Sequence, residues 1–393
     1  MDGGDRFISD RAAMQNAQSY ETFSLPTPSS VFANALGEVM FPQWNRRRIL
    51  FGPSPSTQVD FSYKEPAPVT LEHGSCYAAP GLVDDFYRNP LVWLQSGVYV
   101  ALSRDVYRLD PETRQSRLLT TCDQLVSSLA GTHSGEAVFI GSDNEKLVQQ
   151  DLASGAISQC PSAKAFSMAM RPETHSELAV GGVSVITHVD TRAAKVTRRT
   201  WWGTGQKVPG LHWLNSLMIA TGDNGDTVRV YDVRSDRDPV CQYAHLAGIK
   251  ALSRHPSRNW LASGGGIADR TIKIYDYGSR ELLSTTNTGS QVCGLSWLNA
   301  DLLVSSHGFC AESRPVQLWN YNARLRTLTR VAASENAVGD VAGRSLYLAR
   351  NHRSLEFYVA SSNQTLTHWK ARGVAQDTSK APEHRPLQMR IIR

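Results

Sequence analysis

Hydrophobic and polar residues alternate along the middle of the chain, in short runs separated by turn-forming residues. In three of these runs two aliphatic residues flank one polar residue: Val228-Arg229-Val230, Ile272-Lys273-Ile274 and Val316-Gln317-Leu318. A period of two with one polar face is typical of a half-buried β-strand. Helical solenoids of similar repeat length need amphipathic stretches of roughly ten residues, and the sequence has none. The pattern therefore predicts many short strands.

The runs repeat at a nearly constant interval. Six of them close on an Asp or Asn before a turn: Asp110, Asp151, Asp190, Asp232, Asp276 and Asn320. Neighbouring marks lie 39 to 44 residues apart, and a four-stranded propeller blade repeats about every 40–45 residues. A last run, residues 355–359, ends 39 residues beyond Asn320. Six marks and this run predict an all-β fold, a seven-bladed β-propeller of the WD-repeat class.

Composition divides the chain into three parts. Residues 1–75 are rich in Pro, Ser, Thr and Asn, and their brief apolar clusters bury too little surface to offset the entropy lost on ordering. We expect this region to be disordered. The propeller is assigned to residues 76–362, and the polar, basic residues 363–393 are expected to form a disordered tail.

Overall composition limits the classes of protein to which the chain is expected to belong. The 393 residues are 41% hydrophobic, which is enough for a large core, and the net charge of +5 is too small to argue for nucleic acid. No apolar run follows a basic N-terminus, and no stretch of roughly eighteen apolar residues occurs, so neither a signal peptide nor a membrane span is expected. The six cysteines are scattered without metal-ligand or disulfide spacing, which favours a reducing compartment.

Sequence motifs for catalysis or cofactor binding were sought and not found. Residues 264–266 (GGG) lack the GK[ST] ending of a phosphate-binding loop, and residues 222–226 (GDNGD) lack the terminal Glu of a calcium loop, so turns are expected at both. Neither GxSxG nor HExxH occurs. Four side chains are expected to be structural, two through hydrogen bonds and two in the core: His245, His307, Trp213 and Trp297. The sequence predicts no enzyme, no cofactor and no metal site.

Four segments, in order and at blade spacing, resemble motifs of one family. Residues 84–89 (DDFYRN) with Trp93 resemble its DDFYxN…W entry to the propeller, and residues 264–274 resemble its GGGxxDRxIxIW stretch. Residues 290–293 (SQVC) and 306–309 (SHGF) resemble its SQVC and GHGF motifs. On these motifs the chain is identified as a member of the fizzy family, the WD-repeat co-activators of the anaphase-promoting complex, a ubiquitin ligase. The resemblance covers nearly the whole chain.

Both ends of the chain resemble the family's ligase-binding motifs. The residues that match the C-box are Asp5, Arg6, Phe7, Ile8 and Arg11. Ser9 stands where the C-box usually has proline, and Ile392 with Arg393 resembles the C-terminal Ile-Arg tail. The resemblance implies that both motifs dock onto the ligase, where two weak attachments on one body raise the avidity.

The propeller of this family reads two short degrons, the KEN box and the destruction box (RxxL). For the KEN box the resemblance implies Asp85 and Asn224, with Asp226 in place of a usual Asn. Turn capping is an equally good explanation of Asp85 and Asn224. For the destruction box, acidic residues are expected at the positions that match Ala78 and Arg353. Neither residue is acidic, so we expect weak binding of the destruction-box arginine.

The N-terminal region contains motifs that indicate the family subtype and the cellular location of the protein. Four residues resemble the motif by which a spindle-checkpoint protein captures the mitotic member: Arg48, Ile49, Leu50 and Phe51. Residues 11–15 (RAAMQ) also favour the mitotic member over the late-mitotic, G1-acting one. Residues 46–48 (RRR) are alternatively a nuclear-localisation signal. The expected location is the nucleus and the cytoplasm.

The resemblance implies three kinds of partner. They are subunits of the anaphase-promoting complex, degron-bearing substrates such as mitotic cyclins, and a spindle-checkpoint protein. No binding of nucleic acid or membranes is expected. Other classes stay open, namely a generic WD-repeat scaffold unrelated to ubiquitination, a propeller hydrolase, and a phosphoinositide-binding propeller, whose FRRG loop this sequence lacks.

Overall fold

The computed structural model describes residues 68–373, apart from residues 133, 163, 175, 202–204, 236–237, 311–313 and 335–342. Contacts divide the chain into a unit Met1–Pro66, which lies outside the described residues, and a unit Ala67–Arg393. The described part of the second unit contains twenty-eight strands in seven four-stranded sheets. Nowhere in this part is there an apolar helix of membrane-spanning length. The predicted seven-bladed, all-β propeller is confirmed.

The first three blades follow one another along the chain. Blade 1 consists of β2 (Leu91–Leu94), β3 (Gly97–Leu102), β4 (Asp105–Leu109) and β5 (Ser116–Thr121). Blade 2 consists of β6 (Val126–Gly131), β7 (Ala137–Ser142), β8 (Lys146–Asp151) and β9 (Ile157–Pro161). Blade 3 consists of β10 (Ser167–Met170), β11 (Glu177–Gly181), β12 (Val185–Asp190) and β13 (Lys195–Trp201).

The next three blades have the same order. Blade 4 consists of β14 (Gly210–Trp213), β15 (Met218–Gly222), β16 (Thr227–Asp232) and β17 (Cys241–Ala244). Blade 5 consists of β18 (Ile249–Arg254), β19 (Trp260–Gly265), β20 (Thr271–Asp276) and β21 (Glu281–Asn287). Blade 6 consists of β22 (Gln291–Trp297), β23 (Leu302–Gly308), β24 (Val316–Asn322) and β25 (Thr327–Ala333).

Blade 7 closes the ring with strands from both ends of the described chain. It consists of β26 (Ser345–Arg350), β27 (Glu356–Ser361), β28 (Thr365–Arg372) and, as its outer strand, β1 (Thr70–Ala78). The β1–β28 pairing is antiparallel and runs from Thr70 opposite Arg372 to Ala78 opposite Thr365. The strands therefore extend beyond residues 76–362 at both ends. Most residues of β1 are exposed, and for this reason its composition resembles that of the polar region before it.

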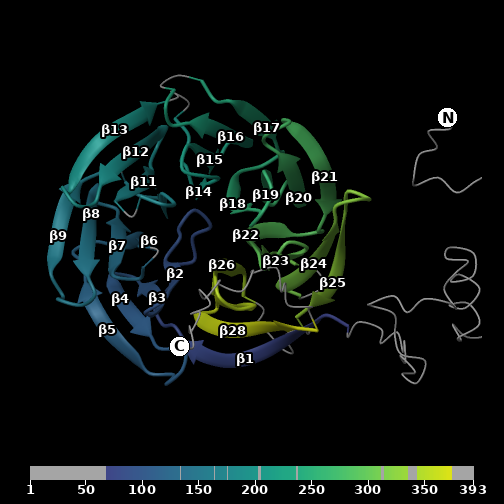
Figure 1. Ribbon diagram of the computed structural model, residues 1–393. Coiled ribbons are helices and arrows are strands. Elements are labelled where there is room, and N and C mark those ends of the chain that lie inside the picture. The colour runs from purple at the N-terminus through teal and green to yellow at the C-terminus, as the bar shows by residue number, and fades with distance from the viewer. Residues whose placement is uncertain are drawn as a thin grey trace, which may run out of the picture. The chain divides into compact units, whose positions relative to one another are not determined.

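The blades stand around a common centre (Figure 1). In each blade the strands are antiparallel, with the inner strand nearest the centre and the outer strand at the rim. We call the end of the ring at which the inner strands begin the upper face, and the end at which they finish the lower face. Because successive strands reverse direction, loops between second and third strands also lie on the upper face.

Aspartates and one asparagine cap the turns that follow the third strands. Asp110 Oδ1, for example, accepts hydrogen bonds from the amides of Glu112 at 2.9 Å and Thr113 at 3.2 Å. An Asp or Asn side chain caps its own turn through hydrogen bonds to the amides that follow it. For this reason the same residue types recur at nearly constant intervals along the sequence. In blade 6 the capping residue is Asn322, two residues beyond the predicted Asn320, which pairs with Leu302 inside the sheet.

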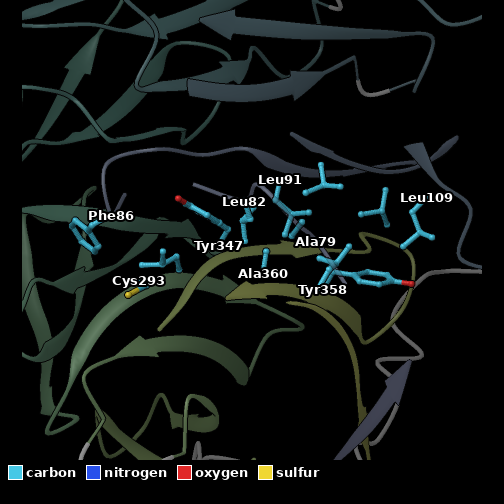
Figure 2. Packing of buried hydrophobic residues seen from close by; sticks show 14 residues of the cluster. Ala79, Leu82, Phe86, Leu91, Leu109, Cys293, Tyr347, Tyr358 and Ala360 are labelled. Carbon is cyan, nitrogen blue, oxygen red and sulfur yellow. The ribbon is translucent and has the colours of Figure 1, made fainter. Parts of the chain in front are cut away.

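Side chains between neighbouring blades form the core. One cluster joins the segment between β1 and β2 to blades 1, 6 and 7, and Figure 2 labels nine of its residues: Ala79, Leu82, Phe86, Leu91, Leu109, Cys293, Tyr347, Tyr358 and Ala360. Full burial of a large apolar side chain contributes about 1.5–3 kcal/mol. Trp213 and Trp297 are buried, as predicted.

Two buried histidines form hydrogen bonds with side chains of blades 5 and 6. His245 contacts Asp269 through Nδ1 at 2.9 Å and the Ser263 hydroxyl through Nε2 at 2.7 Å. His307 contacts the hydroxyls of Ser290 at 2.9 Å and Ser305 at 2.6 Å. Both side chains therefore make the structural hydrogen bonds expected of them. Burial lowers the pKa of His307 to about 3, so this imidazole is neutral at physiological pH.

Candidate functional site

The segment between β1 and β2, residues 79–90, lies over the upper face at the centre of the ring (Figure 1). Asn89 fixes its end, because its Nδ2 donates to the carbonyl of Phe166 at 2.8 Å and to that of Pro209 at 2.9 Å. These carbonyls directly precede β10 and the start of blade 4. The DDFYRN motif is thus a bridge that joins blade 1 to blades 3 and 4.

Asp85 is a turn cap whose carboxylate also reaches the surface. Its Oδ1 accepts from the Tyr87 amide at 2.9 Å, and its Oδ2 lies 3.3 Å from Arg88 Nε. The side chain is 36% exposed. Tyr347 holds the backbone, since its hydroxyl lies 2.6 Å from the carbonyl oxygen of Val83 and 2.8 Å from that of Asp85 and donates to one of them at a time. The capping explanation is therefore correct for Asp85, and it leaves the carboxylate accessible to a ligand.

Asn224 and Asp226 lie on the same face, in the loop between β15 and β16. Asn224 Oδ1 accepts from the Lys207 amide at 2.7 Å, and Lys207 Nζ lies 5.2 Å from the centre of the Tyr87 ring. Asp226 is exposed, and its Oδ1 accepts from the Thr227 hydroxyl at 2.8 Å. Through Lys207 and Tyr87 the structure connects Asn224 to the bridge that carries Asp85.

The preceding Asp223 explains the glycine-rich turn. It is buried, pairs with Arg229, and its Oδ1 accepts from the amides of Gly225, Asp226 and Thr227. This carboxylate is used as a cap, as expected for a turn. Within the described residues no group of three or more His, Cys, Asp or Glu side chains could hold a metal ion.

Lys250 supports the bridge from below, and no sequence pattern predicted this role. Its Nζ donates to the Leu346 carbonyl at 2.8 Å and lies 4.3 Å from the centre of the Tyr347 ring and 5.7 Å from that of Phe86. Burial lowers the pKa of Lys250 to about 7, although nearby Asp85 opposes this shift. Lys250 belongs to blade 5, and Leu346 and Tyr347 belong to blade 7, so only the closed ring brings these residues together.

Arg344 is a second residue of this face that the sequence did not indicate. Its guanidinium pairs with Asp84 and lies 4.9 Å from the centre of the Phe309 ring. Phe309 is exposed and has a left-handed backbone, with φ of 54°, a conformation that costs energy for a bulky residue. Arg344 and Phe309 also line a cavity of about 250 Å³ between blades 6 and 7.

The two positions matched to the destruction-box site lie at opposite ends of blade 7. Ala78 ends β1 at the upper face, opposite Thr365, whereas Arg353 is in the loop between β26 and β27 at the lower face. The residue beside Ala78 is Gln364, whose carbonyl accepts from the Ala79 amide at 2.7 Å. Arg353 therefore lies too far from Ala78 to share a site with it, and the side chain that neighbours the end of β1 is that of Gln364.

The remaining predicted site residues lie outside the described residues. They are Asp5, Arg6, Phe7, Ile8 and Arg11 of the C-box match, Arg48, Ile49, Leu50 and Phe51 of the checkpoint match, and Ile392 and Arg393 at the end of the chain. The structure shows where the segments that carry them join the propeller, at the paired residues Thr70 and Arg372.

Comparisons show which proteins this chain resembles. A family model described as "WD domain, G-beta repeat" matches residues 237–276. "Cell division cycle 20.1, cofactor of APC complex" from Arabidopsis thaliana is 29% identical over 96% of this chain and 89% of its own length. "Meiotic fizzy-related protein 1" from Schizosaccharomyces pombe is 30% identical over 74% of this chain and 69% of its own length.

A solved structure is similar as well. One chain of "Crystal Structure of Mitotic Checkpoint Complex" has a TM-score of 0.69 and 26% sequence identity to this protein. The similarity covers 83% of this chain and 99% of that chain. The sequence similarity and the structural similarity thus both extend over most of this chain.

Proposed function

The chain belongs to the fizzy family of WD-repeat proteins, and we propose that it is a substrate-recruiting co-activator of the anaphase-promoting complex that catalyses no reaction itself. Its relatives are named as a cofactor of this complex and as a fizzy-related protein. The observation that carries the proposal is the pairing of β1 with β28, because it attaches the C-box segment and the Ile-Arg tail to one edge of blade 7.

The lengths of the two segments suit attachment to a single ligase. The 20 residues after Gly373 span at most about 70 Å, and the 58 residues between Arg11 and Thr70 span at most about 200 Å. Both start within one strand spacing of each other, about 5 Å. Two motifs on such tethers bind the same partner with an avidity about 10²–10⁴-fold above that of either one.

The upper face is the proposed degron site. Asp85 and Asp226 present carboxylates that suit the lysine of a KEN box, and Asn224 keeps its side-chain Nδ2 to donate to a carbonyl or carboxylate. The bridge is fixed by Asn89, Tyr347 and Lys250 before any ligand arrives. Pre-organisation of this kind improves affinity because less ordering is lost on binding.

Substrate capture by the propeller is separate from control through the N-terminal region. We propose that Arg48, Ile49, Leu50 and Phe51 add a strand to the sheet edge of a spindle-checkpoint protein, with main-chain bonds supplying the affinity. If Ile49→Asp with Leu50→Asp does not reduce capture in a pull-down, residues 46–48 are better explained as a nuclear-localisation signal. The proposed location is the nucleus and the cytoplasm.

The decisive test is reconstituted ubiquitination with paired tail variants. Deleting Ile392 and Arg393, or changing Arg6→Ala, is expected to weaken ligase binding, and the combination is expected to nearly abolish it. Arg117→Ala, at an exposed position of β5, is the matched control for loss of one arginine. Full activity of the combined variant would contradict the proposal and favour a generic WD-repeat scaffold.

A further inference from the structure

Three arginines stand at the lower ends of inner strands. Arg171 directly follows β10, Arg254 ends β18, and Arg350 ends β26. Arg171 is neutralised by Glu177 and lies 5.3 Å from the centre of the Trp213 ring. Across the described part of the chain, neither Arg254 nor Arg350 has a carboxylate within ion-pair distance.

The two unneutralised arginines are nevertheless held in place. Arg254 donates to the carbonyls of Leu214 at 2.9 Å and Pro256 at 3.2 Å. Arg350 donates through Nε to His352 Nδ1 at 3.2 Å. The terminal nitrogens of Arg350 have no acceptor among the described residues, and its side chain is partly exposed. Its fork of donors is therefore accessible.

A histidine of a third blade joins this cluster. His212 lies on the inner strand β14 and is partly exposed. Arg254 lies beside this strand, since it donates to the carbonyl of Leu214 directly after β14. Burial and the nearby positive charges of Arg254 and Arg350 lower the pKa of His212 to about 4. Burial also lowers the pKa of Arg350 to about 10. The lower ends of inner strands in blades 4, 5 and 7 thus place His212, Arg254 and Arg350 around the centre of the ring, and neither arginine has a carboxylate within ion-pair distance among the described residues.

Such a cluster is unfavourable without an anion. A guanidinium removed from bulk water carries a desolvation cost that only a paired charge recovers, and like charges add repulsion. The planar fork of Arg matches the oxygen spacing of phosphate. We propose that the lower end of the ring centre binds a small soluble anion of the phosphate class, with Arg350 and His212 as donors and Arg254 as a supporting charge.

Binding of an anion is expected to be coupled to proton uptake. A bound dianion favours the charged form of a neighbouring imidazole, so it raises the pKa of His212 above its unliganded value of about 4. Sulfate does not titrate near neutral pH, and protons taken up with sulfate therefore belong to the protein. The proposal predicts tighter sulfate binding as the pH falls from about 7 to 5.5.

The test is calorimetric titration of the full chain with pyrophosphate and with sulfate, at constant ionic strength. Arg350→Gln and Arg254→Gln are each expected to weaken pyrophosphate binding by about tenfold or more. Arg117→Gln on β5 changes the same charge at the rim and should bind like the wild type. His212→Asn should remove the sulfate-linked proton uptake, measured in buffers of different ionisation enthalpy.

Three results would overturn the proposal. They are the absence of binding to the wild type at millimolar pyrophosphate, equal affinity in all variants, and binding only to vesicles that carry phosphoinositides. Folding of the variants is checked by their thermal midpoints without anion. Arg350→Gln should not lower this midpoint, because it removes an unpaired partly buried charge.

Discussion

At the scale of single residues, Lys250 shows how this propeller uses a buried charge. Its ammonium group lies beneath the bridge, bonded to the Leu346 carbonyl and close to the rings of Tyr347 and Phe86. A buried ammonium with no carboxylate partner costs more than its hydrogen bond returns. The pKa of about 7 is the consequence of this burial. Lys250 thus positions the segment that carries Asp85 at some cost in stability.

Lys250→Met is expected to leave stability unchanged or to raise it near neutral pH. Because the pKa is about 7 in the folded state instead of 10.5, the unfolded chain binds more protons between these values. The contribution of this group to the free energy of unfolding therefore rises with pH in that window, by up to about 1.4 kcal/mol per pH unit. Urea unfolding at about pH 7 and pH 8.5 should show the wild type gaining stability relative to the variant.

Lys273→Met is the control, since Lys273 donates to the Ala244 carbonyl at 2.7 Å from a partly exposed position. If Lys250→Met unfolds more readily than the wild type at every pH, then the bond to Leu346 outweighs the desolvation, and this account of Lys250 is wrong.

At the scale of elements, the strands of one blade are joined by buried polar groups as well as by their ladders. In blade 6, His307 links the hydroxyls of Ser290 and Ser305, and the Trp319 indole donates to Ser305 at 2.7 Å. The network spans β22, β23 and β24 at their packed interior. Burial keeps this imidazole neutral, so one of its nitrogens donates to a hydroxyl and the other accepts from one.

Acidification is expected to lower the free energy of unfolding through the His307 network of blade 6. The pKa of His307 is about 3 in the folded protein against an ordinary 6.5, so the unfolded state takes up a proton first as the pH falls. Stability is then lost between about pH 6.5 and pH 3, at about 1.4 kcal/mol per pH unit. In urea unfolding series, His307→Asn should show a smaller loss than the wild type from about pH 6.5 to 5. His73→Asn, at an exposed position of β1, is the matched control, and equal slopes for wild type and His307→Asn would contradict the prediction.

The junction of β1 with the β27–β28 loop offers a test of degron specificity. Ala78 and Gln364 are neighbours at the upper end of blade 7, where the proposed degron site would meet the arginine of an RxxL peptide. Ala78→Asp with Gln364→Glu is expected to tighten binding of such a peptide about twofold to thirtyfold, since two exposed ion pairs add roughly 0.4–2 kcal/mol. Fluorescence anisotropy with the peptide and its Arg→Ala form measures the gain.

Arg353→Glu provides the control for that experiment. It adds negative charge to the same blade at the opposite face, so it should leave peptide affinity unchanged. A gain from Arg353→Glu, and none from the Ala78 and Gln364 pair, would show that the peptide arginine binds near Arg353 and not at the end of β1.

At the scale of the whole molecule, the ring is closed by strands almost 300 positions apart. Seven residue pairs join β1 to β28, and the same junction places the chain segments on either side of the propeller next to each other. Pairing with the mostly exposed, polar β1 covers the edge of β28, which would otherwise be open to aggregation. Stability and proposed ligase docking therefore depend on the same two strands.

Two truncations are expected to behave differently. Removing residues 1–66 leaves every strand in place and should preserve a cooperative thermal transition. Removing residues 1–78 deletes β1 and is expected to cost roughly 4–7 kcal/mol at about 0.5–1 kcal/mol for each lost pair. Differential scanning calorimetry distinguishes the two outcomes, and equal midpoints would show that β1 contributes little to closure.

The sequence by itself determined those features that arise from neighbouring residues. A period of two reports a strand with one buried face, and an Asp such as Asp110 or Asp276 caps its own turn, so both repeat visibly with each blade. Their spacing was sufficient to predict seven blades. The family motifs lie on the same local scale, and the comparisons confirmed the family.

Only the tertiary structure decided what meets across the ring. The end of β1 lies beside Gln364, whose carbonyl accepts from the Ala79 amide, and not beside Arg353. Lys250 supports a bridge that begins about 170 residues earlier in the chain. The outer strand β1 was missed for a related reason, since most of its residues are exposed and its stabilising contacts lie in β28. Pairings between such distant residues leave no periodic signal, because each partner satisfies only its own local geometry until closure of the ring brings the two together.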